Sequence, residues 1–128
     1  MDRSKQIDLV SLQYPTPPPP VGGRLLIYES DKGWAPGVYM QLDVHGLLER
    51  TPGRFYTLYI TSPTLGRRRF SSFNTSGPGL PAPAFRLDEW NVPADYLTET
   101  ITVEVINEED DGTAGMGVHD FTALTGNG

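Results

Sequence analysis

The sequence contains no cysteine and only two histidines among its 128 residues. Without thiols the chain cannot form disulfides, thiolate-bound zinc sites, iron–sulfur clusters or cysteine nucleophiles. Small secreted domains often depend on disulfides, so this absence favours an intracellular protein. No apolar run is long enough for a membrane-spanning helix, and the first ten residues lack the apolar segment of a signal peptide. We therefore expect synthesis in the cytoplasm without a signal peptide, and no membrane partner.

Motifs for catalysis or cofactor binding are also missing. His45 and His119 are the only candidate imidazole bases, and no Gly-x-Ser-x-Gly motif supplies a serine nucleophile. The glycines of segment 112–117 are spaced as Gly-x-x-Gly-x-Gly, which is neither the dinucleotide-binding nor the P-loop pattern. We expect no enzyme activity, no metal and no cofactor. A small hydrolase that uses His45 or His119 is the least favoured alternative.

Positive charge is scarce, since 10 lysines and arginines accompany 16 acidic residues and the net charge is −6. A protein that binds duplex DNA or RNA needs the opposite sign on at least one face, so we expect no nucleic-acid partner. The only basic run is Arg67, Arg68 and Arg69. It predicts either a solvated turn or edge strand, or a contact with an acidic neighbouring subunit.

Glycine and proline are abundant, with 14 and 12 residues, and no segment has a helical period of useful length. Apolar residues alternate over 38–44 and 100–107, which is the period of a half-buried strand. Weaker strand patterns cover 7–12, 24–29, 55–61, 68–73, 84–88 and 118–122, and one helical turn is expected at 92–97. The expected fold is all-β, an antiparallel β-sandwich of about eight short strands with an extended Pro-rich N-terminal arm.

The expected arm covers residues 1–23 and precedes a sandwich domain over 24–128. Four consecutive prolines stiffen it, because a polyproline II segment has a fixed φ and no internal hydrogen bonds. A stiff segment loses little entropy on docking, so we expect it either to order on another subunit or to act as a linker. The candidate partner-binding residues are Ile7, Leu9, Val10, Leu12, Tyr14, Pro17, Pro18, Pro19 and Pro20 in the arm, and Arg67, Arg68 and Arg69 in the sandwich.

Carboxylates cluster in the segment 107–112, at Glu108, Glu109, Asp110 and Asp111. Calcium prefers carboxylate oxygens, although a solvated hairpin with an Asp-Gly turn gives the same pattern. Aromatic side chains indicate either a sugar-stacking platform or ordinary sheet packing, at Trp34, Tyr39, Tyr56, Tyr59 and Trp90. A C2-like or carbohydrate-binding ligand module is therefore the alternative function, with its site in the loops near Asp43, Glu108–Asp111, Trp34 and Trp90.

Residues 85–121 resemble the last third of a C2-type β-sandwich. Trp90 precedes the strand pattern of 101–106, the acidic segment follows, and Met116-Gly-Val118 leads into the next strand. The resemblance implies a sandwich fold, which an immunoglobulin-like sandwich would share. The family's earlier calcium aspartate would fall near Arg54 or Phe55, so the resemblance does not imply a complete calcium site.

The first hypothesis for function is a non-enzymatic structural subunit of a large assembly. A small cysteine-free β domain with a stiff arm and no catalytic motif is suited to occupying the surface between other subunits. The expected setting is a bacteriophage or phage-like virion, in which the chain would be a capsid cement or decoration, neck or baseplate component. The expected partners are other copies of the chain in a homo-oligomer, a major shell protein or a tail protein.

Overall fold

The computed structural model of the chain describes residues 3–11, 22–30, 37–45, 54–73, 85–89, 91–109 and 121–128. These residues form strands and one short helix. The strands are β1 (Ser4–Ser11), β2 (Gly22–Ser30), β3 (Gly37–His45), β4 (Arg54–Ser62), β5 (Gly66–Phe73), β6 (Phe85–Glu89), β7 (Thr102–Glu109) and β8 (Phe121–Asn127). The helix is α1 (Asp95–Thr98), which confirms the helical turn expected at 92–97.

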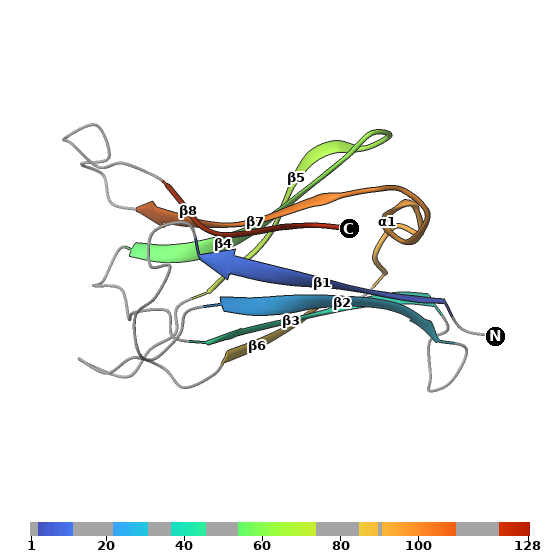
Figure 1. Cartoon of the computed structure of the whole chain (residues 1–128), viewed down its shortest axis with the longest axis horizontal. Helices are drawn as coiled ribbons and strands as arrows, with labels where there is room; N and C mark the ends of the chain where they lie inside the picture. The colour runs from blue at the N-terminus through green and yellow to red at the C-terminus, as the bar shows by residue number, and fades with distance from the viewer. Residues whose placement is uncertain are drawn as a thin grey trace.

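The strands form one antiparallel sheet of 8 strands, in the order β5-β4-β7-β8-β1-β2-β3-β6. Figure 1 shows that this sheet curls, so that β4, β5, β7 and β8 lie across from β1, β2, β3 and β6. We call the first group the β4 half and the second group the β2 half. The all-β antiparallel prediction is confirmed, and the two layers are joined as one continuous sheet.

The inner faces of the two halves share one hydrophobic core. On β3, side chains alternate between buried and partly exposed, and the buried ones are Val38, Met40, Leu42 and Val44. The same alternation on the other strands adds Leu25 and Ile27 from the β2 half, and Leu58, Ile60, Val103, Val105 and Leu124 from the β4 half. Burial of apolar surface contributes about 25 cal/mol per Å², so this shared core is what holds the curled sheet together.

Strand β1 corrects the prediction of an N-terminal arm. Over Ser4–Ser11 the chain is an interior strand that pairs with β2 along most of its length and with β8 at its end. Ile7 is 1% exposed and Leu9 is 3% exposed, so both pack in the chain's own core and are not available to a partner. The period-2 alternation of this segment turns these two side chains to the inner face of the sheet. Leu12, Tyr14 and Pro17–Pro20 lie outside the described residues.

The two halves meet where β1 lies beside β8. Among the described residues, the two strands pair through Val10 with Thr125 and Ser11 with Leu124. Beyond this pairing Gly126 lies against the backbone of β1, and a Cβ there would sit 2.3 Å from the carbonyl oxygen of Asp8. Real Cβ atoms do not approach so closely, so this junction requires a glycine.

Lys5 ties β1 to the helix and to the end of β8. Its Nζ donates to the carbonyl oxygens of Tyr96 at 2.7 Å, Glu99 at 2.6 Å and Gly128 at 3.2 Å. An ammonium has three donors, and these carbonyls use all of them. Burial lowers the pKa of the Lys5 amine, because the charged form loses solvation there. The contact fixes the start of β1 over the core.

Strands β5 and β6 are the two edges of the sheet. The curl brings them close enough for the Ser71 hydroxyl of β5 to donate to the Glu89 carboxylate of β6. Among the described residues, no backbone ladder joins these two strands, so the sheet is a half-barrel that is open along this seam.

Candidate functional site

The described residues offer little for catalysis or metal binding. His45 is exposed at the end of β3, and a Cβ on Gly22, its cross-strand partner, would contact the imidazole ring at 3.5 Å. His119 lies outside the described residues. In the part of the chain that the structure describes, no group of three or more His, Cys, Asp or Glu side chains could hold a metal ion.

Most of the expected ligand-binding residues lie outside the part of the chain that the structure describes. Glu108 and Glu109 belong to β7 through their backbone, while Asp110, Asp111, Trp34 and Trp90 lie outside the described residues. Tyr56 is 4% exposed and packs against Phe73 in the core. Tyr39 and Tyr59 belong to opposite halves of the sheet. Among the described residues, Tyr39, Tyr56 and Tyr59 therefore do not line one shared platform.

The three arginines of the basic run lie on the edge strand β5 and are exposed. The Arg67 guanidinium lies 3.9 Å from the ring centroid of Tyr59, and its Nε is 3.9 Å from Oε1 of Glu104. Arg69 donates to Oγ of Ser72 at 2.8 Å. Charged side chains on an edge strand hinder pairing with a further strand. These contacts fit the edge-strand interpretation, and a contact with an acidic neighbour stays a prediction.

Arg68 lies near the buried phenol of Tyr96. Burial raises the pKa of Tyr96, and the positive charge of Arg68 partly opposes this effect. Tyr96 is fully buried, packs edge-on against Phe70 at 6.0 Å, and its hydroxyl lacks a hydrogen-bond partner within the described structure.

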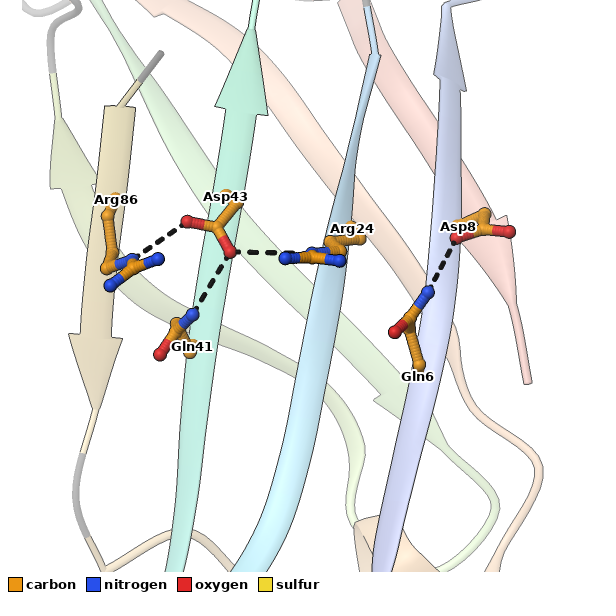
Figure 2. A network of polar contacts seen from close by, with 6 residues as sticks. All are labelled: Gln6, Asp8, Arg24, Gln41, Asp43 and Arg86. Carbon is orange, nitrogen blue, oxygen red and sulfur yellow. Dashed lines mark hydrogen bonds and ion pairs between the residues drawn. The ribbon is translucent and has the colours of Figure 1, made fainter.

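The most organised polar feature is a row of charges across the outer face of the β2 half, which we call the charge row. Its members are Asp8 of β1, Arg24 of β2, Asp43 of β3 and Arg86 of β6. Each lies directly opposite the next in the strand register. Figure 2 shows the four side chains side by side, with the signs of their charges alternating from one strand to the next.

Asp43 is the centre of the ion pairs in the charge row. Its Oδ1 accepts a hydrogen bond from Nε of Arg86 at 2.9 Å, and its Oδ2 lies 3.6 Å from Nε of Arg24. Gln41 also donates to Oδ2 at 3.1 Å (Figure 2). Burial raises the pKa of Asp43, but the hydrogen bonds from Arg86 and Gln41 and the two nearby positive charges outweigh it, and the net pKa is lowered. The carboxylate is therefore ionised at neutral pH.

The outer face of the β2 half continues on either side of the charge row. The next cross-strand row holds Gln6, Leu26, Gln41 and Asp88. The row after it places Tyr28 opposite Tyr39, and their rings stack with centroids 5.7 Å apart. Val10, on the same face of β1 as Asp8, is 57% exposed and is the one exposed large hydrophobic residue among the described residues.

Sequence reasoning assigned Asp43 to a ligand loop and assigned no role to Asp8, Arg24 or Arg86. Each of these charges stands at an outward position of an alternating strand, which is a visible signal. Only the strand order and register show that the four stand in one row. Val10 was a candidate partner-binding residue, and the structure leaves it exposed beside the charge row.

Comparison with known proteins gave no match: no protein-family model, no curated protein and no solved structure proved similar to this chain. Among the described residues, no helix has the length and apolar character that crossing a membrane requires.

Proposed function

We propose that this chain is a non-enzymatic subunit of a larger protein assembly and that it binds neighbouring subunits through the outer face of the β2 half. The observation that carries the proposal is the charge row. Four charges of alternating sign are held in register by four adjacent strands, next to a stacked tyrosine pair and an exposed valine.

The energetics of surface charges support this interpretation. Exposed ion pairs contribute only about 0–1 kcal/mol each to folding, so the charge row adds little to the stability of the fold. A fixed pattern of charges is more effective in recognition, because complementary charges speed association and exclude wrong partners. Side chains held by a sheet are also ordered before binding, which lowers the entropy lost on association.

We further propose a bacteriophage or phage-like particle as the assembly, with the chain serving as a cement or decoration, neck or baseplate protein. A small cysteine-free β domain without catalytic motifs supports this setting. Val10 supports a protein contact on the same face, since exposed apolar side chains gain from burial.

Sedimentation of native material tests the proposed function. A gradient of lysate from the source, with the chain detected by antibody, is expected to place it in fast-sedimenting particles together with other proteins. Electron microscopy of those fractions then shows whether they are virion-like. Expression of the chain with Arg24→Glu should reduce its incorporation, and the same change at Arg67 on the β4 half tests separately whether the basic run contacts an acidic neighbour. Recovery of the unaltered chain only as a free monomer would overturn the proposal.

A further inference from the structure

We infer that the outer face of the β2 half binds the same face of a second copy of this chain, about a two-fold axis that runs parallel to the strands. The inference rests on the proposed function and names the partner of its binding surface. It follows from the order of charges in the charge row and from the direction of the strands.

The charge row is antisymmetric about its centre. From β1 to β6 the signs are negative, positive, negative and positive, and the centre lies between Arg24 and Asp43. A two-fold axis along the strands, passing between β2 and β3, reverses this order on the facing copy. Asp8 then meets the partner's Arg86, and Arg24 meets the partner's Asp43. Every charge in the row therefore faces a charge of opposite sign, and the two-fold symmetry makes each of the two contacts occur twice.

Other face-to-face arrangements are disfavoured. A two-fold axis that crosses the strands along the charge row leaves the order of the row unchanged, so each charge would face its own copy. Like charges placed against each other strongly disfavour association, and this arrangement contains four such contacts. When the two charge rows face each other, their signs therefore select an axis parallel to the strands.

The neighbouring rows fit the same axis. Gln6 comes to face the partner's Asp88, which pairs an amide donor with a carboxylate. Tyr28 comes to face the partner's Tyr39, so the two stacked pairs meet at the interface. Tyrosine is enriched in the buried centres of protein interfaces because its ring is apolar and its hydroxyl is polar. No residue in these rows meets a like charge.

The intrachain ion pairs do not prevent these contacts. Arg86 reaches Asp43 through Nε, and a guanidinium has five donors, so it can bridge a carboxylate on each copy. Side-chain exposures of 54% for Arg24 and 60% for Arg86 leave both groups accessible. Asp8 is exposed, and its described bond is one from Gln6 at 3.3 Å.

The size of the face sets the expected strength of the dimer. Strands about 4.8 Å apart with about 3.3 Å per residue give four strands of this length a face of roughly 500 Å². Two copies together would bury roughly 1,000 Å², which is at the low end for specific complexes. The dimer is therefore weak, sensitive to salt, and populated at the high local concentrations of an assembly.

Sedimentation equilibrium of the purified chain over a wide concentration range tests the inference. The expected result is a monomer–dimer equilibrium whose Kd rises with added salt. The variants Asp8→Arg and Arg86→Asp each place like charges in the outer contacts of the row. Each should weaken the dimer by at least about tenfold. Arg67→Asp changes the net charge by the same amount on the β4 half and should leave the Kd unchanged.

An equimolar mixture of the two variants is the decisive measurement. In a mixed dimer the new cation at position 8 faces the new carboxylate at position 86, and Arg86 of one copy faces Asp8 of the other. The mixture should therefore associate within about threefold of the parent, although neither variant does so alone. The double variant D8R/R86D should recover association for the same reason.

A parent chain that stays monomeric at every concentration overturns the inference, and so does a mixture that fails to associate while both variants remain folded. If a variant unfolds in circular dichroism, the neutral changes Asp8→Asn and Arg86→Gln replace it, with the same direction expected. A monomeric parent that still sediments with native particles would refute the pairing and leave the proposed function standing. A chain that is monomeric in both experiments would refute both.

Discussion

The two halves of the sheet are alike on the inside and different on the outside. Each half has four antiparallel strands and turns an apolar face to the shared core. The outer face of the β2 half holds the charge row. The β4 half instead carries hydroxyl groups that bond to their neighbours: Thr102 with Asn127 at 2.9 Å, Thr122 with Glu104 at 3.1 Å and the buried Thr57 with Ser72 at 2.9 Å.

Charges on the β4 half lack the antisymmetry of the charge row. One cross-strand row of this half holds Arg69, Tyr59, Glu104 and Thr125. The axis that makes the charge row complementary would place Arg69 against a threonine and Glu104 against a tyrosine. The comparison shows that the two outer faces of one sheet can differ in kind. Polar groups on the β4 half bond mainly to neighbours in the same chain, whereas the charge row on the β2 half has an order that is complementary to itself. The distinction lies in the order of side chains across strands, not in composition.

The largest expected effect lies at the junction that joins the halves. Gly126→Ala would place a Cβ 2.3 Å from the backbone oxygen of Asp8, so β1 or β8 must move. We expect a loss of about 3 kcal/mol in the free energy of unfolding, the upper end for overpacking. Chemical denaturation measures it. Gly66→Ala is the control, because no described atom lies within 4 Å of its Cβ and only its φ of 70° is strained, so it should cost about 1 kcal/mol. Equal losses for the two variants would contradict close packing at the junction.

Lys5 provides the next test, because it fixes β1 of the β2 half to α1 and to the end of β8. Lys5→Met keeps an unbranched side chain of four heavy atoms but removes the ammonium that donates to three carbonyl oxygens. Leaving partly buried acceptors without a donor costs about 1 kcal/mol, the low end of the range for buried groups, and thermal unfolding measures the loss. Lys5→Arg restores the charge but not the converging geometry, so an intermediate stability is expected. A Lys5→Met variant as stable as the parent would show that water replaces the ammonium.

The contribution of Asp43 to the free energy of unfolding should depend on pH. Its pKa is lowered in the folded protein, so the unfolded chain binds a proton at higher pH than the folded chain does. The stabilisation is therefore complete above the ordinary aspartate pKa of about 3.9 and is lost as the pH falls through the lower folded value. We expect Asp43→Asn to cost about 1 kcal/mol at pH 7 and less at pH 3. A difference in unfolding free energy that grows on acidification would have the wrong sign.

Substitution of one arginine on each outer face should have the smallest effect on stability, but it should distinguish the two faces in self-association. Arg67→Ala removes a cation–π contact with Tyr59 and a long ion pair with Glu104, and Arg86→Ala removes the bond to Asp43. Each change should lower the melting temperature only slightly, because exposed contacts of this kind add little to stability. Only Arg86→Ala should also weaken self-association in sedimentation. Equal effects of both variants on association would remove the distinction between the faces.

Strand patterns in the sequence were reliable where apolar residues alternate. The segments expected at 38–44 and 100–107 are β3 and β7, and their predicted inward residues are buried. The last strand was expected at 118–122 but runs from Phe121 to Asn127. Gly126 and Asn127 are residue types typical of turns, but here both belong to the strand. Gly126 is needed there because its backbone lies too close to Asp8 of β1 for any side chain.

The arm and the charge row show where local patterns stop being informative. The alternation of 7–12 predicted a strand, but the proline run after it suggested a segment separate from the domain. The pairing of β1 with β2 and β8 is a long-range property that no local pattern contains. Asp8, Arg24, Asp43 and Arg86 were likewise ordinary outward charges until four strands placed them in one register.

The amino-acid sequence by itself determined that this protein is all-β and which side chains of each strand face inward, because a period of two is a local property of an extended chain. Only the tertiary structure decided which strands are neighbours, that the first strand lies within the sheet, and that charges from four strands form one alternating row. These depend on how the whole chain buries its apolar faces, since the same alternation is compatible with many strand orders.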